Sequence, residues 1–240
     1  MSSAFGYPSK IAVLGGRSEI GEAIVKEIKG HNPHAKTVAC VRNPQGGEIE
    51  FDATKPGSAE KALEEAKTLL GDIDCVIISF GVLGSESENL DNPRRAGEVA
   101  STNYSGAVEA GVASGSILSR RGGGCIVYLS SIAGVRVRGN MSVYGSSKLG
   151  ADAFYRAASN IWAQSGVKTV VVRPGYVRTK MTSRIREPLG AVEAGDVARV
   201  VVDGIGEPGV LQIVYTSTLL KLVAKIFKIL PNYIWNRIKI

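Results

Sequence analysis

Tyr144 and Lys148 lie four positions apart at the start of a long segment with helical spacing, YGSSKLGADAFYRAASNIWAQSG. This spacing places both side chains on one face of a helix. The pair suits the reduction of a ketone, because the tyrosine can donate a proton to the developing alkoxide and the lysine can stabilise the remaining phenolate. An ammonium about 4 Å away contributes roughly 4 kcal/mol, enough to lower a tyrosine pKa by about three. The pair therefore predicts Tyr144 as a proton donor.

A second pair with the same spacing, Tyr176 and Lys180, has different surroundings. Ser131 follows an apolar run, 13 residues before Tyr144, where its hydroxyl can polarise the same carbonyl oxygen. The equivalent position before Tyr176 is Ala163, which has no hydroxyl. We therefore interpret Tyr176 as a residue of loop packing or substrate contact.

Asn103, in the segment STNYSGA, adds a fourth polar group. Taken alone, an asparagine in a helix is typical of a solvated position. A lone Ser131 would likewise be typical of a turn or helix cap at the end of a strand. The ordered set of Asn103, Ser131, Tyr144 and Lys148 nevertheless favours catalysis over these separate interpretations.

The stretch LGGRSEIG, residues 14–21, has the features of a phosphate-binding turn between a strand and a helix. Gly15, Gly16 and Gly21 let the backbone approach a pyrophosphate, and the start of the helix supplies free N–H groups. Glu19 stands where the GxxxGxG spacing has its middle glycine. An acid at the first helical residue also suits the helix dipole, which explains Glu19 without a ligand.

The elements that must position these residues alternate between short apolar runs and helical segments. The predicted strands are 10–14, 37–41, 74–79, 125–130, 168–173 and 210–215, all rich in apolar or β-branched residues. The pattern predicts an α/β fold with a doubly wound parallel sheet, a Rossmann fold, and helices on both faces. Ligands bind beyond the carboxyl ends of such strands, and that is where LGG, SFG, SS and RPG occur.

Length and composition predict one globular domain, because 240 residues with 44% hydrophobic positions suffice for a single core. The three cysteines fall in apolar runs without metal or redox spacing, so we expect reduced core residues in a cytosolic protein and no metal site. The first ten residues lack a signal peptide, and no run of 18 apolar residues occurs. Much of the net charge of +7 comes from the last residues, which argues against nucleic-acid binding.

On LGGRSEIG, SFGVLG, LSSIAG, YGSSK and RPGYVRT, the chain resembles the short-chain dehydrogenase/reductase family up to about residue 215. The resemblance implies Asn103, Ser131, Tyr144 and Lys148 as a catalytic tetrad, with Asn103 supporting a water relay. It also implies an adenine contact from Asp52 and a nicotinamide-side segment that contains Pro174, Gly175 and Thr179. The predicted cofactor-binding residues are Gly15, Arg17, Ser18, Glu19, Ile20, Gly21, Arg42, Asp52, Gly81, Tyr144, Lys148, Pro174, Gly175, Val177 and Thr179.

Two departures from the family pattern narrow the resemblance. Residues 78–81 read ISFG where the family has NNAG, and Glu19 replaces a glycine. With AGVRVRGNMSVYGSSK and the basic apolar end of the chain, these features are similar to the actinobacterial reductases of decaprenylphosphoryl-2-keto-ribose. That similarity implies a polyprenylphosphoryl keto-sugar substrate, decaprenylphosphoryl arabinose for cell-wall arabinan as product, and an FAD-dependent oxidase partner. The family resemblance also implies a homo-oligomer through the helices that carry Asn103 and Tyr144.

Two alternatives remain open. One is reduction of another lipid-like ketone, of acyl or steroid type. The other is a scaffold that senses the cofactor without chemistry, motivated by Glu19 and the missing NNAG, although the intact catalytic set argues against it.

The choice between NADH and NADPH depends on two arginines. Arg42 follows the second predicted strand, where an acid would bind the ribose of NAD and a cation can accommodate the 2′-phosphate of NADP. Arg17 could assist Arg42. The narrower resemblance implies NADH, and an arginine in an exposed loop is more often solvated than bound to phosphate, so we favour NADH.

Residues 216–240 form a predicted basic amphipathic tail after the domain of residues 1–215. Lys221, Lys225 and Lys228 recur at helical spacing, and Pro231 ends or kinks the helix. About 12 helical residues reach roughly 18 Å, short of the roughly 30 Å core of a bilayer. We therefore expect the tail to lie on the inner-membrane surface, with Tyr233 and Trp235 at headgroup depth, or alternatively to dock on protein. The predicted substrate contacts, beside Tyr176, are Arg136, Arg138 and Lys180, with Arg184 and Arg186 further along the same loop.

Overall fold

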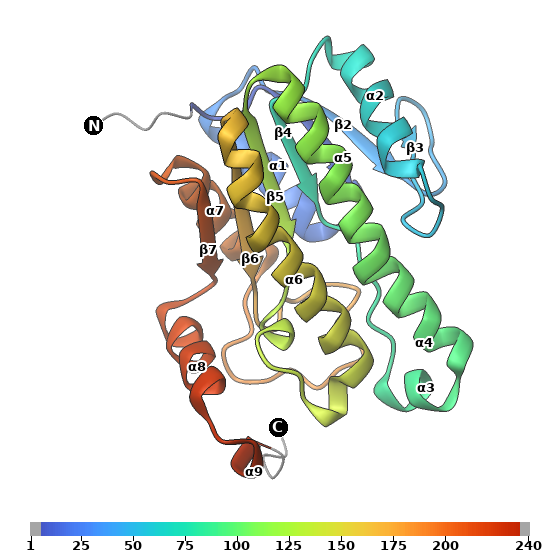
Figure 1. Ribbon diagram of the computed structural model, residues 1–240, viewed down its shortest axis with the longest axis vertical. Helices are drawn as coiled ribbons and strands as arrows, with labels where there is room; N and C mark the ends of the chain where they lie inside the picture. Colours follow the sequence, from blue (N-terminus) through green and yellow to red (C-terminus); the bar gives the residue numbers. More distant parts are fainter. Residues whose placement is uncertain (1–5, 236–240) are drawn as a thin grey trace.

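The computed structural model describes residues 6–235, and these form one α/β domain around a parallel sheet (Figure 1). The predicted doubly wound fold is confirmed. The strand order is β3-β2-β1-β4-β5-β6-β7, and every neighbouring pair is parallel. The strands are β1 Lys10–Leu14, β2 Lys36–Val41, β3 Ile49–Glu50, β4 Cys75–Ile78, β5 Gly124–Leu129, β6 Val167–Arg173 and β7 Leu211–Tyr215.

Two helical layers cover the sheet and bury its apolar side chains. One face packs against α2 (Ser58–Leu70), α5 (Gly106–Arg121) and α6 (Ser142–Trp162). The other packs against α1 (Glu19–His31) and α7 (Ala194–Gly206). Burial on both faces explains why the strands read as continuous apolar runs rather than as alternating patterns.

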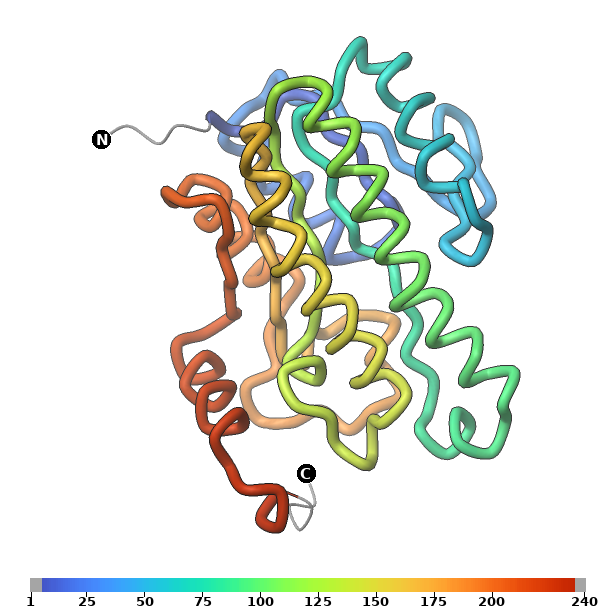
Figure 2. Tube along the Cα trace, viewed as in Figure 1, coloured from blue at the N-terminus to red at the C-terminus, as the bar shows by residue number. Residues whose placement is uncertain are grey.

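The sheet order changes direction beside β1, because β2 and β3 extend to one side of it and β4 to β7 to the other. The carboxyl ends of β1 and β4 therefore border the crevice in which such sheets bind ligands. The short helices α3 (Glu86–Asp91) and α4 (Pro93–Ala100) follow β4 beyond this edge. The loop of residues 174–193 follows β6 and passes below the same edge (Figure 2).

The chain after β7 forms α8 (Thr218–Ile229) and α9 (Asn232–Trp235), which extend beyond the carboxyl edge of the sheet (Figures 1 and 2). α8 ends before Pro231, as predicted. Within residues 6–235, no helix is long and apolar enough to cross a bilayer. The expectation that the first ten residues lack a signal peptide falls partly on residues 1–5, and the basic tail ends in residues 236–240; both stretches lie outside the described residues.

The short strand β3 is absent from the sequence prediction. It pairs with β2 through Cys40 and Val41. A strand of two residues is too short to show a periodic pattern in the sequence. It is recognised only from its pairing with β2 at the edge of the sheet. Buried Cys40, Cys75 and Cys125 are free thiols, as predicted.

Candidate active site

The turn between β1 and α1 has the geometry of an anion site. Gly15 has a left-handed φ of 88°, and a Cβ there would come within 2.7 Å of the Phe80 amide nitrogen. Ser18 caps α1, and its side chain accepts the Gly21 N–H. Because α1 begins at Glu19, its first N–H groups have no intrahelical partner. This end of the helix can therefore hold a phosphate group.

Ser79 connects this turn to the end of β4. Its hydroxyl donates to the carbonyl oxygen of Gly15 at 3.0 Å, and a Cβ on Gly21 would lie 2.6 Å from the same hydroxyl. A short polar side chain is therefore needed where the family pattern has asparagine. Ser79 and Phe80 are not among the site residues predicted from the sequence, although their position directly after a strand was the available signal.

The catalytic helix α6 is held at its start by a carboxylate from another helix. Glu86 of α3 accepts the N–H of Ser142 at 2.6 Å and that of Val143 at 3.4 Å, as well as the Ser142 hydroxyl. A carboxylate at a helix start satisfies its free N–H groups and suits the helix dipole. Glu86 thereby fixes the turn that carries Tyr144.

Lys148 lies one turn further along α6, with only 4% of its side chain exposed. Its Nζ donates to the carbonyl oxygen of Leu129 at 2.8 Å. A Cβ on Gly81 would come within 3.5 Å of this nitrogen, so the glycine leaves room for the ammonium. Burial lowers the pKa of Lys148 to about 8, although the charge of Asp152 acts in the opposite direction.

Tyr144 is half-buried and lines the same pocket as Ser131 and Lys148. Burial raises the pKa of Tyr144, and the Ser131 hydroxyl partly counters this effect. A tyrosine kept protonated in this way can donate a proton to a carbonyl oxygen. Ser131 can hydrogen-bond the same oxygen, while its side chain also accepts the Ala133 N–H as a cap.

Asn103 lies in a π-helical turn, Ser101–Ser105, between α4 and α5. Its amide accepts the Val82 N–H at 2.9 Å and donates to the Val82 carbonyl at 2.7 Å and to Ser147 Oγ at 3.3 Å. Asn103 therefore holds the segment after β4 against α6. Its water relay remains a prediction.

A buried ion pair lies one further turn along α6. Asp152 accepts from Arg173 at 2.6 and 2.8 Å and from the Ser130 hydroxyl at 2.7 Å. Arg156 also donates to Asp152, at 2.8 Å. Burial opposes the charge of Asp152, but hydrogen bonds and charge from Arg173 hold the pKa of this carboxyl below its usual range. The network joins the ends of β5 and β6 to the catalytic helix.

A pocket of about 470 Å³ connects the phosphate turn with the catalytic group. This volume lies within the usual range for ligand sites. The pocket also includes Phe80, Thr102, Ser130, Met181 and Thr182, which are not among the residues predicted from the sequence. The predicted residues that line it are Gly15, Arg17, Ser18, Glu19, Ile20, Arg42, Asp52, Gly81, Ser131, Tyr144, Lys148, Pro174, Gly175, Val177, Thr179 and Lys180.

The end of the pocket beside β2 contains paired charges. Arg17 donates to Glu48 at 2.6 and 3.2 Å and to the Asn43 carbonyl at 3.0 Å. The hydrogen bond from Arg17 holds the pKa of Glu48 below its usual range. Asp52 accepts from the Thr54 N–H and hydroxyl. Arg17 is therefore already engaged by an acid, which weakens its predicted role as a phosphate ligand of NADP.

These residues fit a dinucleotide cofactor. The first N–H groups of α1 suit its pyrophosphate, Lys148 and Tyr144 suit the ribose and nicotinamide end, and the wall beside Asp52 suits adenine. When bound, the cofactor supplies the hydride. We propose that the start of α1 provides the anion site, Tyr144 the proton donor and Lys148 the buried ammonium that stabilises the resulting phenolate.

Arg136 does not face the pocket as a phosphate ligand. It donates to the Phe227 carbonyl at 2.8 Å, to the Leu230 carbonyl and to Asn232 Oδ1 at 2.6 Å. Its guanidinium lies 4.9 Å from the ring centroid of Trp235. Carbonyls at the end of α8 engage its donors, so the structure does not support the predicted lipid-phosphate contact of Arg136, which stays a prediction.

The other predicted substrate residues lie in different places, and most of them are away from the pocket. The Tyr176 hydroxyl donates to the Thr182 and Ile185 carbonyls at 2.9 and 3.1 Å, which supports the loop-packing interpretation. Arg138 is half-buried and donates to Met141 Sδ at 3.4 Å. Lys180 lines the pocket, whereas the other predicted substrate contacts, Arg184 and Arg186 included, are not among its lining residues.

Two other predicted site residues, Gly21 and Asn103, lie behind the pocket wall, where they position its backbone.

A doubly wound sheet with a phosphate turn and a serine, tyrosine and lysine at its carboxyl edge defines a nicotinamide-dependent oxidoreductase. The profile described as "short chain dehydrogenase" matches residues 9–190. The chain belongs to this short-chain dehydrogenase family and is an NAD(P)-dependent oxidoreductase.

Individual relatives agree with this membership. The chain is 34% identical to the Streptomyces coelicolor protein named "Uncharacterized oxidoreductase in mprA 5'region", over 98% of both chains. It is 26% identical to the 3-oxoacyl-[acyl-carrier-protein] reductase MabA of Mycobacterium avium, over 79% of this chain and 76% of that one. A short chain dehydrogenase of Burkholderia cenocepacia, solved with NADP, has the same fold, with a TM-score of 0.77 and 20% identity over 92% of this chain and 94% of that one.

Proposed function

We propose that this enzyme reduces the keto group of a sugar joined through phosphate to a polyprenyl lipid. The substrate is decaprenylphosphoryl-2-keto-erythro-pentofuranose, and the product is decaprenylphosphoryl arabinofuranose for cell-wall arabinan. An FAD-dependent oxidase partner supplies the ketone. The motifs ISFG, SEIG and RVRGNMSVYGSSK support this substrate beyond the general family pattern.

The observation that carries the proposal is the position of α8 and α9 beside the catalytic segment. Trp235 Nε1 donates to the carbonyl oxygen of Val137 at 2.7 Å, and Arg136 joins the same segment to α8. Residues 136 and 137 lie between Ser131 and Tyr144. An amphipathic tail in this place can hold a lipid chain near the reacting group.

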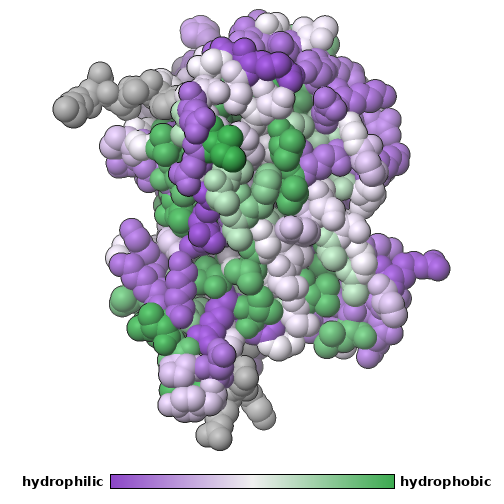
Figure 3. Space-filling model, in the orientation of Figure 1, coloured by the Kyte–Doolittle hydropathy of each residue, from purple (hydrophilic) through white to green (hydrophobic). Residues whose placement is uncertain are grey.

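α8 exposes an apolar stripe on the face that does not pack on the domain. Leu219, Leu222, Ile226 and Ile229 recur at helical spacing with 70%, 55%, 43% and 80% of their surface exposed. Each of the last three follows a lysine, so a basic stripe lies beside the apolar one. Figure 3 shows hydrophobic and hydrophilic side chains side by side over this part of the molecule. This surface suits the boundary of an anionic bilayer, reached peripherally from the cytoplasm.

Lipid binding through this stripe has a direct test. Replacing both Leu222 and Ile226 by serine is expected to weaken sedimentation with phosphatidylglycerol vesicles by at least about tenfold, because each buried leucine-sized side chain contributes roughly 1.5–3 kcal/mol. Leu69→Ser, at an exposed leucine of α2, is the matched control and should bind as the parent does. Equal binding by all three proteins would contradict a membrane role for α8.

The substrate is tested by coupled turnover. The enzyme, the flavin oxidase and polyprenylphosphoryl ribose are incubated with NADH or with NADPH, and the lipid-linked sugar is identified after hydrolysis. We expect arabinose, and higher kcat/KM with NADH, because the Glu48 carboxylate near Arg17 disfavours a 2′-phosphate. Unchanged keto sugar together with rapid reduction of acyl ketones would favour the second candidate, a reductase of acyl-type substrates, for which the similarity to MabA is the specific observation.

A homo-oligomer is also part of the proposal. The outer faces of the helical layer near Asn103 and Tyr144 expose Tyr104, Val112 and Leu149. Burial of these side chains against a second copy would remove apolar surface from water.

A further inference from the structure

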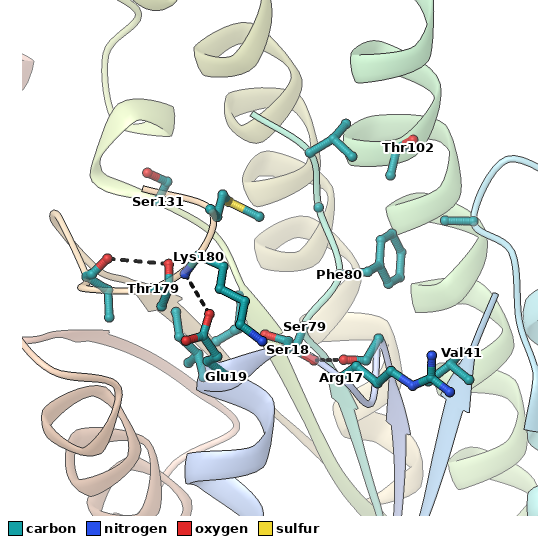
Figure 4. A pocket seen from close by; sticks show the side chains of 18 of the residues that line it. Arg17, Ser18, Glu19, Val41, Ser79, Phe80, Thr102, Ser131, Thr179 and Lys180 are labelled. Carbon is teal, nitrogen blue, oxygen red and sulfur yellow. Dashed lines mark hydrogen bonds between the residues drawn. The ribbon is translucent and has the colours of Figure 1, made fainter. Parts of the chain in front are cut away.

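Glu19 joins two walls of the pocket that are distant in sequence. Its Oε2 accepts the backbone N–H of Lys180 at 2.7 Å, across 161 residues. Figure 4 shows the Glu19 carboxylate directed at the loop that carries Lys180. Both residues line the cofactor pocket. The acid that replaces a glycine of the phosphate turn therefore has a defined partner.

The loop end of this contact is a compact unit. The Thr179 N–H donates to Thr182 Oγ1 at 3.2 Å, and the Thr182 hydroxyl donates to the Val177 carbonyl. Tyr176 bonds the Thr182 carbonyl from the other side. Because these bonds hold residues 176–182 together, the contact at Lys180 positions the whole segment relative to α1.

Residues 179–182 and the phosphate turn both border the pocket, and the Glu19 contact connects them across it. A dinucleotide that extends from the start of α1 to Tyr144 would lie beside this connection. The Lys180 ammonium belongs to the same segment, so its charge offsets that of Glu19 near a pyrophosphate.

We propose that Glu19 is a positioning residue that closes residues 179–182 over the bound cofactor and slows its release. A carboxylate bonded to a backbone N–H is a charge-assisted contact that only a side-chain acceptor at residue 19 supplies. The proposal does not depend on the identity of the ketone, because cofactor release can be measured without substrate.

The test compares cofactor dissociation rates of four proteins. NADH and NADPH are each displaced from the full chain by excess oxidised cofactor in a stopped-flow fluorescence experiment. Glu19→Ala is expected to release the reduced cofactor about tenfold faster than the parent, in the range of one charge-assisted hydrogen bond. Glu19→Gln keeps an acceptor oxygen and is expected to restore slow release to within about threefold of the parent.

Glu22→Ala is the matched control. Glu22 is the other acid in the first turn of α1, and it is exposed. Its removal costs the helix a similar dipole interaction without touching the loop. We expect parental dissociation rates for this variant.

Limited trypsin digestion provides a second measurement on the same proteins. With cofactor present, Glu19→Ala is expected to be cut faster after Lys180 and Arg184 than the parent and the other variants, while thermal melting shows that it remains folded. Three results would overturn the proposal: parental release and digestion in Glu19→Ala, equal acceleration in Glu22→Ala, or fast release in Glu19→Gln.

Discussion

Tyr144→Phe is expected to lower kcat by about 10²- to 10⁴-fold, the usual contribution of a positioned general acid. We assign the phenol hydroxyl as the proton donor, and phenylalanine keeps the ring but not the proton. Binding of the reduced cofactor should change little, because the start of α1 and the wall beside Asp52 are untouched. Steady-state rates and a fluorescence titration on one preparation separate the two effects.

The second pair with the same spacing offers the control for this result. Tyr176→Phe removes a hydroxyl that bonds only loop carbonyls among the described residues. Its kcat should remain within about threefold of the parent, as for substitutions outside a reacting group. Equal losses in the two variants, or normal turnover in Tyr144→Phe, would refute the assignment of Tyr144.

Asp152→Asn is expected to destabilise the fold by about 3–5 kcal/mol, because it leaves the buried Arg173 guanidinium without its anionic partner. Both side chains are nearly inaccessible, with 1% of the Asp152 and 3% of the Arg173 side chain exposed. At roughly 2–4 °C per kcal/mol for a chain of this size, the melting temperature should fall by about 10 °C. Asp203→Asn, at an exposed position of α7, should melt as the parent does.

The pair also determines how stability responds to acid. The pKa of Asp152 lies below its ordinary value of 3.8 in the folded protein. Its contribution to stability is therefore fully present above about pH 4 and is lost as the pH falls through the depressed folded value. Denaturation curves should give the parent a larger free energy of unfolding at pH 6 than at pH 3. The difference between the two pH values should be smaller in Asp152→Asn.

Asp152→Asn is also expected to move the alkaline limb of the pH profile of kcat/KM. Lys148 has a lowered pKa of about 8, so its ammonium supports the Tyr144 phenolate below that pH and is lost above it. For the parent, kcat/KM of ketone reduction should therefore fall as the pH rises through about 8. Asp152 raises the pKa of Lys148, so Asp152→Asn should shift this limb to lower pH. An unshifted limb together with an unchanged melting temperature would contradict the role of Asp152.

Local patterns were sufficient for most of the architecture. Continuous apolar runs indicated six of the seven strands, since a sheet buried on both faces needs no alternation. The helix from Ser142 to Trp162 and the turn at Gly15 could be predicted because their signals lie within one element. Ser131 distinguished the Tyr144–Lys148 pair from the Tyr176–Lys180 pair. This distinction could be made from the sequence because a single loop connects Ser131 to Tyr144.

The contacts that the sequence could not predict join residues far apart in the chain. Arg136 is the clearest case, because a basic residue before Tyr144 suggested a phosphate ligand, whereas the carbonyls that it bonds lie more than 90 residues later. Glu86 and Asp152 likewise have no local motif. Their partners Ser142 and Arg173 are brought to them only by the packing of α3 and of β6 against α6.

The bond between Trp235 and Val137 has a practical consequence for producing this protein. A purification tag on the carboxyl-terminal side of α9 would follow Trp235, whose indole bonds the loop between Ser131 and Tyr144. A tag on the amino-terminal side would instead precede β1, whose first residue lies at the amino edge of the sheet. Kinetic comparisons should therefore use protein tagged at the amino terminus, because we expect a carboxyl-terminal tag to disturb this loop without any substitution in the pocket.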